Sequence, residues 1–419
     1  MRRVRAQARK NQSFPGATEA LGVVVEEGAV SVAMIQALIP LGLQAVNEAL
    51  QQEVTQLAGR RYERDDGQPH VVRWGHQAGS VFLADQKVPV RVPRVRDRRR
   101  GREVSLATYA QLQTPRALDA GLFRRVLGGL SCREYQRAAE AVPEAFGLAK
   151  SSVSRRFQRV SARALRDLQE RRLDDRQWLV LVLDGKSFAA DEVVVALGVT
   201  TIGEKRILGL VQTASENKRV CASFLRELSE RGFAPTGPLL VVIDGAKGLR
   251  AAVTEVFGAR ADVQRCQWHK RENVVSYLPK GEQVTWRRKL QAAYAKPSYA
   301  EAKQALLRLE RELRVRNVSA AASLLEGLEE TLTLHRLGVF PALGRSFKTT
   351  NLLESVMARV QERTARVDHW RTSDQKLRWS AASLLAIEAQ FRRVKGYQTL
   401  HLLEQALQTK ITTSIRDAA

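Results

Sequence analysis

Two aspartates of the 419-residue chain directly follow apolar runs. Asp184 follows WLVLVL, which begins at Trp178, and Asp244 follows PLLVVI, which begins at Pro238. Runs of Val, Leu and Ile of this length are typical of strands that are buried on both faces. The carboxyl end of such a strand is the usual position of a ligand site in an α/β sheet. Because an aspartate after a strand most often serves as a turn or cap residue, its function depends on the groups that accompany it.

A third carboxylate, Glu354, lies in a predicted helix that Thr349, Thr350 or Asn351 can cap. Three carboxylates at one point repel each other, and divalent cations relieve this repulsion. Ligands that are all oxygen favour Mg²⁺, or Mn²⁺, over zinc. Two such ions about 4 Å apart activate an attacking oxygen and stabilise the leaving oxygen of a phosphodiester. With water as the nucleophile such a site cuts a DNA strand, and with a DNA 3′-hydroxyl it joins two strands.

The elements that must position the two aspartates lie between residues 173 and 279. Strands are predicted at Trp178–Gly185, Val193–Thr200, Lys205–Ala214, Pro238–Gly245 and Ala261–His269, and helices at Lys218–Gly232, Ala246–Phe257 and Lys270–Tyr277. Short links make the first three strands antiparallel neighbours, whereas strands separated by helices are parallel. This is the strand order of an RNase H-like domain, in which the first and fourth strands are adjacent. Asp184 and Asp244 are therefore expected at the ends of neighbouring strands.

The expected fold class is α/β, or α+β overall. An RNase H-like mixed β-sheet forms the catalytic core, an all-helical insertion interrupts it, and a mainly helical DNA-binding region with a helix-turn-helix precedes it. The expected domains are residues 1–105, a basic region of helices and a small hairpin; 106–172, the helical DNA-binding domain; 173–279, the first part of the core; 280–343, the insertion; and 344–419, the second part of the core with C-terminal helices at about 372–394 and 397–409.

The N-terminal region is predicted from its periodicity. Residues 23–57 carry apolar residues at helical spacing and indicate two helices broken by Pro40, residues 70–95 alternate as in a β-hairpin, and residues 106–130 are helical again. The hairpin ends in a basic run, Pro89–Arg102. This run is either a solvated face or a set of phosphate contacts, and the charge of the whole chain favours phosphate contacts.

Residues 131–168 have the layout of a helix-turn-helix, with a turn at Gly147 and a second helix that Ser151 or Ser152 opens. In this motif the N-terminal residues of the second helix read the major groove. The polar and basic residues at this position are Lys150, Ser151, Ser152, Ser154, Arg155 and Arg156. Val153 and Phe157 are expected to face the first helix. The alternative is an ordinary helical hairpin.

The composition indicates a partner with many negative charges. The formal net charge is +24 and the sequence pI is about 10.6, as is typical of nucleic-acid binders. No apolar run approaches the roughly 18 residues of a membrane span, and the basic N-terminus lacks a signal-peptide core. Three widely spaced cysteines fit a reducing compartment and make neither a disulfide framework nor a four-ligand zinc site. A cytoplasmic nucleic-acid-binding protein with no membrane partner is expected.

Several short motifs carry a resemblance to a known family. They are Ile207-Leu208-Gly209, Arg231-Gly232-Phe233, Asp244-Gly245-Ala246-Lys247-Gly248, Gln264-Arg265-Cys266 with His269, and Thr349-Thr350-Asn351 with Glu354. Over about residues 145–395 the chain resembles the mutator-type transposases of bacterial insertion sequences. These are DDE transposases with an RNase H-like domain and a helical insertion. The resemblance implies that Asp184, Asp244 and Glu354 form the catalytic, metal-binding triad and hold two Mg²⁺ or Mn²⁺ ions.

The function that this resemblance implies is DNA transposition. A transposase binds the terminal inverted repeats of its element, cleaves the strands and transfers them to target DNA. Because two element ends are paired, a homodimer on double-stranded DNA is expected, in the cytoplasm at the bacterial nucleoid. The alternatives are a sequence-specific DNA-binding protein without catalysis and an RNase H-like nuclease without joining activity. A pure binding protein has no need of the three carboxylates.

The cysteine, histidine, arginine and tryptophan residues near these motifs each have two possible interpretations. Cys266 and His269, spaced C-x-x-H, belong to the family pattern and either pack under the active site or orient DNA or the metal ions there. Arg359 and Arg363 follow the third carboxylate at roughly helical spacing and either contact DNA or form a solvated basic face. Trp286 is expected in a core, with stacking on an unpaired base as the alternative.

Overall fold

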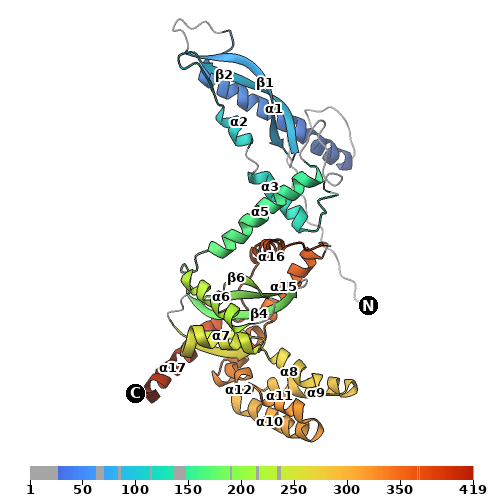
Figure 1. The fold of residues 1–419 in the computed structure, drawn as a ribbon, viewed down its shortest axis with the longest axis vertical. Helices are drawn as coiled ribbons and strands as arrows, with labels where there is room; N and C mark the ends of the chain where they lie inside the picture. Colours follow the sequence, from blue (N-terminus) through green and yellow to red (C-terminus); the bar gives the residue numbers. More distant parts are fainter. Residues whose placement is uncertain are drawn as a thin grey trace. The chain divides into compact units, whose positions relative to one another are not determined.

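The computed structural model describes residues 27–62, 70–83, 86–113, 116–133, 135, 148–188, 191–213, 217–233, 237–365, 367 and 369–418. The chain forms two compact units, the first of Met1–Leu118 with Ala139–Leu148 and the second of Asp119–Ala138 with Ala149–Ala419. Figure 1 gives the labels of the helices and strands of both units. No helix in the described part of the chain is long and apolar enough to cross a membrane.

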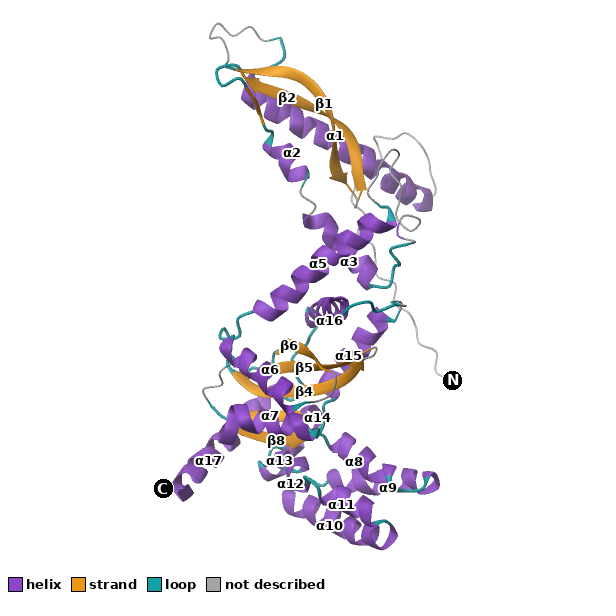
Figure 2. Ribbon diagram, viewed as in Figure 1, coloured by secondary structure: helices purple, strands orange, loops and turns teal. Residues whose placement is uncertain are grey.

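The first unit contains a three-stranded antiparallel sheet and two helices beside it. Its elements are α1 (Glu27–Ala58), β1 (Val71–Leu83), β2 (Gln86–Asp97), β3 (Arg102–Val104) and α2 (Ala107–Leu112), with the strands in the order β1-β2-β3. Val46, Leu50 and Val54 of α1 pack in one core with Val81 of β1 and Val92 of β2. Figure 2 shows α1 lying along the two long strands. The predicted hairpin is confirmed.

The prediction of two helices broken at Pro40 is wrong, because α1 continues through this residue. A proline inside a helix removes one backbone hydrogen bond and crowds the preceding turn, at a cost of about 3 kcal/mol. Two features of α1 offset this cost. Ala, Leu, Gln, Glu and Met, which favour helix, make up more than half of its residues. Its C-terminal half also buries an apolar stripe against the hairpin.

The basic run Pro89–Arg102 lies mainly on β2. Val90, Val92 and Val95 are buried there, whereas Arg91 is exposed. The alternation of a strand thus directs valines to the core and leaves arginine at the surface. Both interpretations of the run, solvated face and phosphate contact, require this exposure.

The second unit is built on a five-stranded mixed sheet. Its strands are β4 (Trp178–Phe188), β5 (Asp191–Thr200), β6 (Lys205–Thr213), β7 (Leu239–Ile243) and β8 (Ala261–Arg265), in the order β6-β5-β4-β7-β8. β5 pairs antiparallel with β4 and with β6, and β7 pairs parallel with β4 and with β8. The predicted pairing is confirmed, including the contact between the first and fourth strands. The mixed α/β, overall α+β character is also confirmed.

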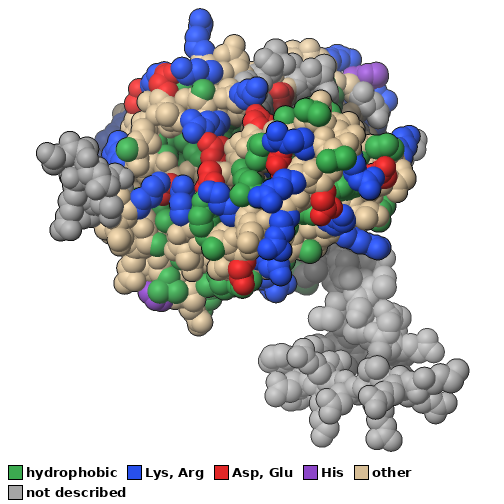
Figure 3. All heavy atoms as spheres, turned by 90° about the horizontal axis from the view of Figure 1, so that it is seen from below, with side chains coloured by type: hydrophobic (Ala, Val, Ile, Leu, Met, Phe, Trp, Pro, Cys, Tyr) green, Lys and Arg blue, Asp and Glu red, His purple; other side chains and the backbone are tan. Residues whose placement is uncertain are grey.

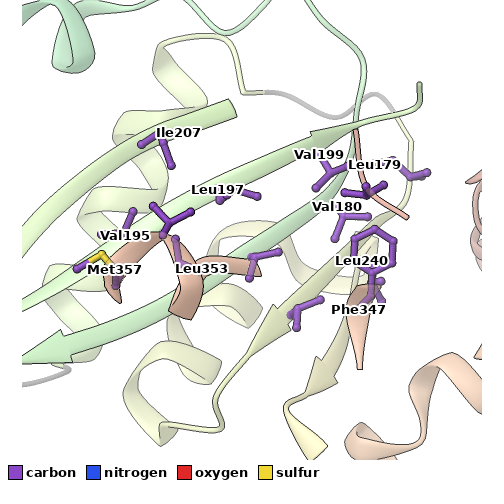
Figure 4. Packing of buried hydrophobic residues seen from close by; sticks show 14 of the residues in the cluster. Leu179, Val180, Val195, Leu197, Val199, Ile207, Leu240, Phe347, Leu353 and Met357 are labelled. Carbon is purple, nitrogen blue, oxygen red and sulfur yellow. The ribbon is translucent and has the colours of Figure 1, made fainter. Parts of the chain in front are cut away.

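Helices cover both faces of this sheet. One face carries α6 (Lys218–Glu230) and α7 (Lys247–Phe257), and the other carries α14 (Phe340–Phe347), α15 (Asn351–Thr364), α16 (Ser373–Glu388) and α17 (Leu400–Ala418). Val180 and Val182 of β4 pack on the α15 side, and Leu181 and Leu183 pack on the α6 side. Figure 4 shows this packing on the α15 side, with Leu353 of α15 among the labelled residues.

An all-helical segment separates β8 from α14. It consists of α8 (Gln267–Ser276), α9 (Lys280–Tyr294), α10 (Tyr299–Arg316), α11 (Val318–Leu325), α12 (Leu328–Thr331) and α13 (Thr333–Arg336). The segment has its own hydrophobic core, in which Trp286 and Leu306 are buried, so the core position expected for Trp286 is confirmed. Gln264 of β8 ties the segment to the sheet. Its side chain donates to the Thr331 carbonyl at 2.9 Å and accepts from the Leu334 amide at 3.0 Å.

The predicted helices around the sheet are confirmed with small changes of boundary. α3 (Arg116–Leu127) precedes the sheet in the chain, and α16 and α17 follow it. The 3-10 turns η1 (Gly258–Arg260) and η2 (Tyr397–Thr399) lead into β8 and α17. α16 ends at Glu388, several residues before the predicted end.

The second helix of the predicted helix-turn-helix is α5 (Lys150–Glu170). It begins earlier than predicted, because the Ala149 carbonyl already accepts hydrogen bonds from the amides of Ser152 and Val153. The Phe157 ring packs against Trp379 of α16, with centroids 4.4 Å apart, and stacks on Phe123 of α3. The first helix of the motif falls almost wholly on residues 134–147, nearly all of which lie outside the described residues.

Candidate active site

The register of β4 and β7 places Asp184 and Asp244 opposite each other. Val182 pairs with Val242 in parallel, and each aspartate comes two residues later in its own chain segment. Side chains two residues apart point to the same face of a strand. Val182 and Val242 both pack on the α15 side, so Asp184 within β4 is directed to that side, and Asp244 begins the turn that follows β7. Adjacent strands lie about 5 Å apart, so the pairing of β4 with β7 is compatible with the prediction that the two carboxylates are neighbours.

Asp184 is nearly fully buried, with 4% of its surface exposed. The prediction that it ends its strand is wrong, because β4 continues to Phe188. Beyond Val182, β4 no longer pairs with β7. It still pairs with β5, with Asp184 opposite Val195, and this pairing continues to Phe188. Asp184 therefore lies where the parallel pairing stops and the antiparallel pairing continues.

Asp244 and Gly245 form the turn after β7. Asp244 is half-buried, and its Oδ1 accepts a hydrogen bond from the Ala246 amide at 3.0 Å. Gly245 has a φ of +112°, and a Cβ at this position would lie 2.1 Å from Nε of Arg265. Only glycine fits both the backbone conformation and the approach of the arginine. The Asp-Gly pair is thus needed to turn the chain sharply at the aspartate.

Glu354 lies in the first turn of α15, where an acidic side chain interacts favourably with the helix dipole. Thr350 is the N-cap residue, but its side chain makes no capping hydrogen bond. Its Oγ1 instead donates to Glu354 Oε1 at 2.8 Å. Thr350 is fully buried, so this hydrogen bond fixes the carboxylate from the interior.

Cys266 and His269 are brought to the same carboxylate. Cys266 follows β8, its amide donates to the Ile243 carbonyl at 2.7 Å, and its Sγ lies 3.7 Å from Thr350 Oγ1. His269 Nδ1 lies 4.0 Å from Glu354 Oε1. The prediction that β8 extends to His269 is wrong, because the strand ends at Arg265 and His269 lies in the first turn of α8.

The ligand atoms of Cys266, His269 and Glu354 lie within 4.8 Å of one another. Among the described residues this is the one group of three or more His, Cys, Asp or Glu side chains at that spacing, and Asp184 and Asp244 are outside it. His269 Nδ1 is buried and has no hydrogen-bond partner in the described part of the chain. Burial raises the pKa of the Cys266 thiol, which favours its neutral form.

Two buried cations, Lys270 and Arg265, lie near the site, and only Arg265 belongs to a motif found in the sequence. Lys270 is fully buried, and its Nζ donates to the Ser323 carbonyl at 2.7 Å and to Glu326 Oε2 at 3.2 Å. Burial lowers the pKa of Lys270 to about 8. Arg265 donates to the Glu326 carbonyl at 3.2 Å. These residues link the site to the helical segment, but a lysine beside His269 looks like any surface cation in the sequence.

The predicted DNA-contact residues on α5 differ in exposure. Lys150, Ser151 and Arg155 are exposed, Ser152 and Ser154 are half-buried, and Arg156 is buried with 8% exposed. Because α5 packs through Val153 and Phe157, its opposite side carries Ser151 and Arg155. Arg156 is the one member of the predicted set that a DNA duplex cannot reach freely.

Arg359 and Arg363 follow Glu354 on α15 and are half-buried. Arg359 donates a hydrogen bond to the side chain of Gln390. Burial lowers the pKa of Arg363, and the nearby Arg359 adds to the effect. The nearby Glu362 opposes both effects. Guanidinium groups on one helix are suited to bind an anion.

Comparison with known proteins identifies the family. The family model described as "Transposase, Mutator family" matches residues 28–393. The chain therefore belongs to the Mutator family of transposases.

Three relatives are transposases of insertion sequence elements. That of element IST2 from Acidithiobacillus ferrooxidans is 34% identical over 42% of this chain and 57% of its own length. That of IS6120 from Mycolicibacterium smegmatis is 29% identical over 57% of this chain and 74% of its own. That of IS406 from Burkholderia multivorans is 26% identical over 86% of this chain and 95% of its own. The chain thus spans little more than half of the first relative and nearly all of the last.

Proposed function

We propose that this protein is a DNA transposase that binds the terminal inverted repeats of an insertion sequence, cleaves the DNA there and joins the cut ends to target DNA. The observation that carries the proposal is the parallel pairing of β4 with β7, which contain or precede Asp184 and Asp244, in a sheet on which α15 with Glu354 packs. Membership of the Mutator family supports it, as does the strand order β6-β5-β4-β7-β8, which is that of an RNase H-like core.

In this proposal Asp184, Asp244 and Glu354 hold two Mg²⁺ or Mn²⁺ ions. The residues fit such ions, because carboxylate oxygens are the ligands that Mg²⁺ and Mn²⁺ prefer. Bound at that point, the ions supply activation of the attacking oxygen and stabilisation of the leaving oxygen. Thr350 holds the Glu354 carboxylate in place through its hydrogen bond. His269 Nδ1 is buried, has no hydrogen-bond partner among the described residues and lies 4.0 Å from Glu354 Oε1, so it helps to orient the same carboxylate.

The remaining parts of the chain receive roles in the same proposal. Residues 106–172 form the DNA-binding domain, 173–279 and 344–419 form the RNase H-like core, and 280–343 form the insertion. The partners are the terminal repeats and target DNA, both double-stranded. Two protomers pair the two ends of the element, at the nucleoid in the bacterial cytoplasm.

The proposal is tested with the variants Asp184→Asn, Asp244→Asn and Glu354→Gln. Each should lower the rate of strand cleavage at a terminal repeat by at least about 10²-fold, because each removes a charge that stabilises the transition state. Binding of the repeat, measured by gel shift, should stay within a few-fold of the wild type. Glu362→Gln is the matched control, because Glu362 is exposed on the same helix. Wild-type cleavage by any of the three variants would remove that residue from the site.

A second assay separates transposition from the alternatives. A pre-cleaved repeat end with a free 3′-hydroxyl is mixed with a target plasmid and a divalent cation. The transposase should give covalent end–plasmid products, which a nuclease without joining activity does not give. If the protein only binds DNA, the wild-type chain should give neither cleavage nor joining.

A further inference from the structure

A cavity of about 630 Å³ opens at the end of the sheet opposite to Asp184. It is lined from the turn between β5 and β6, from the segment before β4 and from the end of α16. Its lining includes Thr200, which pairs with Trp178 at the start of β4. Asp184 lies six positions beyond Trp178 along β4, which is about 20 Å at 3.3 Å per residue. The cavity is therefore distinct from the candidate active site.

Cations dominate the lining of this cavity. Six of its side chains are Arg or Lys and two are Glu. They are Arg171, Arg176, Lys205, Arg206, Arg392 and Arg393, with Glu204 and Glu388.

Three of these arginines already have carboxylate partners. Arg171 pairs with Glu388 at 2.8 Å, Arg206 pairs with Asp175 at 2.8 Å, and Arg176 pairs with Glu204. Both glutamates of the lining thus already form ion pairs with arginines of the lining. The other three cations have no acidic partner among the described residues, so the cavity retains an excess of about three positive charges.

Of the three remaining cations, Lys205 begins β6, and Arg392 and Arg393 follow the end of α16. Lys205 Nζ lies 5.0 Å from the centre of the Phe391 ring, and the Arg393 guanidinium lies 5.2 Å from that of Tyr397. Arg392 is exposed. Burial lowers the pKa of Lys205, since no carboxylate compensates its loss of water. A half-buried ammonium group without a counter-charge is stabilised when an anion binds.

We propose that this cavity binds phosphate groups of a DNA duplex outside the active site. The inference rests on the proposed function, which brings DNA to this unit. α16, whose end contributes to the cavity, packs on the same side of the sheet as α15. DNA that is cut at Asp184 and follows this side would present phosphates to the cavity about six base pairs away, at 3.4 Å per base pair. A phosphodiester needs charge rather than base recognition, and arginine and lysine provide it.

Cations on one face of the molecule are arranged differently. Figure 3 shows a face on which Lys and Arg side chains are spread among Asp and Glu. Scattered cations of this kind give weak, diffuse attraction. The cavity differs because three cations without carboxylate partners converge on one hollow.

The test uses the double variant Lys205→Gln, Arg392→Gln in the full chain. The matched control is Arg288→Gln, Arg311→Gln, which removes the same charge from exposed sites on the helical segment. The dissociation constant for a repeat duplex is measured by fluorescence anisotropy at several salt concentrations. Each lost phosphate contact lowers the slope of log K against log salt by about 0.9. We expect the slope of the cavity variant to be smaller by about 2. Between 50 and 200 mM salt, the ratio of wild-type to variant affinity should then change by roughly tenfold.

The control variant should keep the wild-type slope, and cleavage at saturating protein should persist in both variants. A wild-type slope in the cavity variant would overturn the inference. A calorimetric titration with inorganic phosphate at constant ionic strength tests whether the cavity binds a free anion instead of DNA. The inference would also be overturned if the cavity variant lost the heat of phosphate binding but kept the wild-type DNA slope. If the double variant does not fold, Arg392→Gln alone, at an exposed site, should lower the slope by about 1. Failure of wild-type cleavage would affect only the proposed function.

Discussion

Thr350 is the residue on which the geometry of the candidate active site depends most. It has no exposed surface, and one hydroxyl lies against both Glu354 Oε1 and Cys266 Sγ. A hydroxyl hydrogen serves one acceptor at a time, so the shorter contact, to Glu354, is the one that positions the carboxylate. Such outer partners of a metal ligand typically contribute 10- to 100-fold to activity or metal affinity.

The variant Thr350→Val therefore should lower the rate of strand cleavage by about 10-fold or more. Valine keeps the shape and removes the hydroxyl, so the loss of folding stability should be near 1 kcal/mol. Cleavage kinetics over a range of Mg²⁺ concentrations check the prediction, since a misplaced carboxylate should raise the concentration needed for half-maximal rate. Thr350→Ser should restore most of the rate. Equal rates for Thr350→Val and wild type would show that the hydroxyl does not position Glu354.

At the scale of elements, α5 has two sides with different tasks. Its buried side holds Phe157 between Phe123 and Trp379, so it is anchored to α3 and α16. Its exposed side carries Arg155 near the N-terminal end, where a recognition helix contacts DNA. Arg156 belongs to the buried side. Substituting both arginines together would therefore mix DNA contact with packing.

Arg155→Ala alone should weaken binding to the terminal repeat, and it should lower the preference for repeat over unrelated DNA if α5 reads bases. A lost base contact costs about 1–3 kcal/mol, or roughly 5- to 150-fold in affinity. Gel shifts on repeat and unrelated duplexes measure both quantities. Arg166→Ala, at an exposed site three turns further along α5, is the control. Unchanged binding of the repeat by Arg155→Ala would mean that another element recognises it.

The sheet could be predicted from the sequence because its strands are continuous apolar runs with short or helical links. Runs such as LLVVI of β7 leave few alternatives to a buried strand. The extension of β4 beyond Asp184 could not be predicted, since DGKSF is polar and only the pairing with β5 keeps it extended. The end of β8 was missed for a similar reason, because tertiary contacts of Cys266 and Gln267 decide where the helix begins.

Of the candidate site, the sequence indicated the three carboxylates and the Cys-x-x-His pair. It could not indicate that Thr350 contacts Glu354, because a threonine before a helix is normally a cap. Nor could it indicate the buried Lys270, whose partners Ser323 and Glu326 are more than fifty residues away. Contacts between distant segments leave no local pattern to detect.

At the scale of the whole molecule, the net charge of +24 predicts strongly salt-dependent binding. A protein that makes 6–10 phosphate contacts loses about 10³- to 10⁵-fold in affinity between 50 and 200 mM salt. We expect this range for the full chain on duplex DNA, measured by anisotropy. Repeat and unrelated duplexes should give similar slopes, because phosphate contacts carry no sequence information. A loss of less than tenfold would be inconsistent with binding through phosphates.

The position of the helical segment between β8 and α14 has a consequence for protein synthesis. Asp244 and Glu354 are separated by this segment. At about 5–20 residues per second, a ribosome needs roughly 5 to 20 s to proceed from one to the other. During that time the nascent chain has both aspartates but lacks Glu354, and it also lacks Arg392 of the cavity. On the proposed site, the growing chain would thus lack one of its three carboxylates until the C-terminal part of the core has left the ribosome.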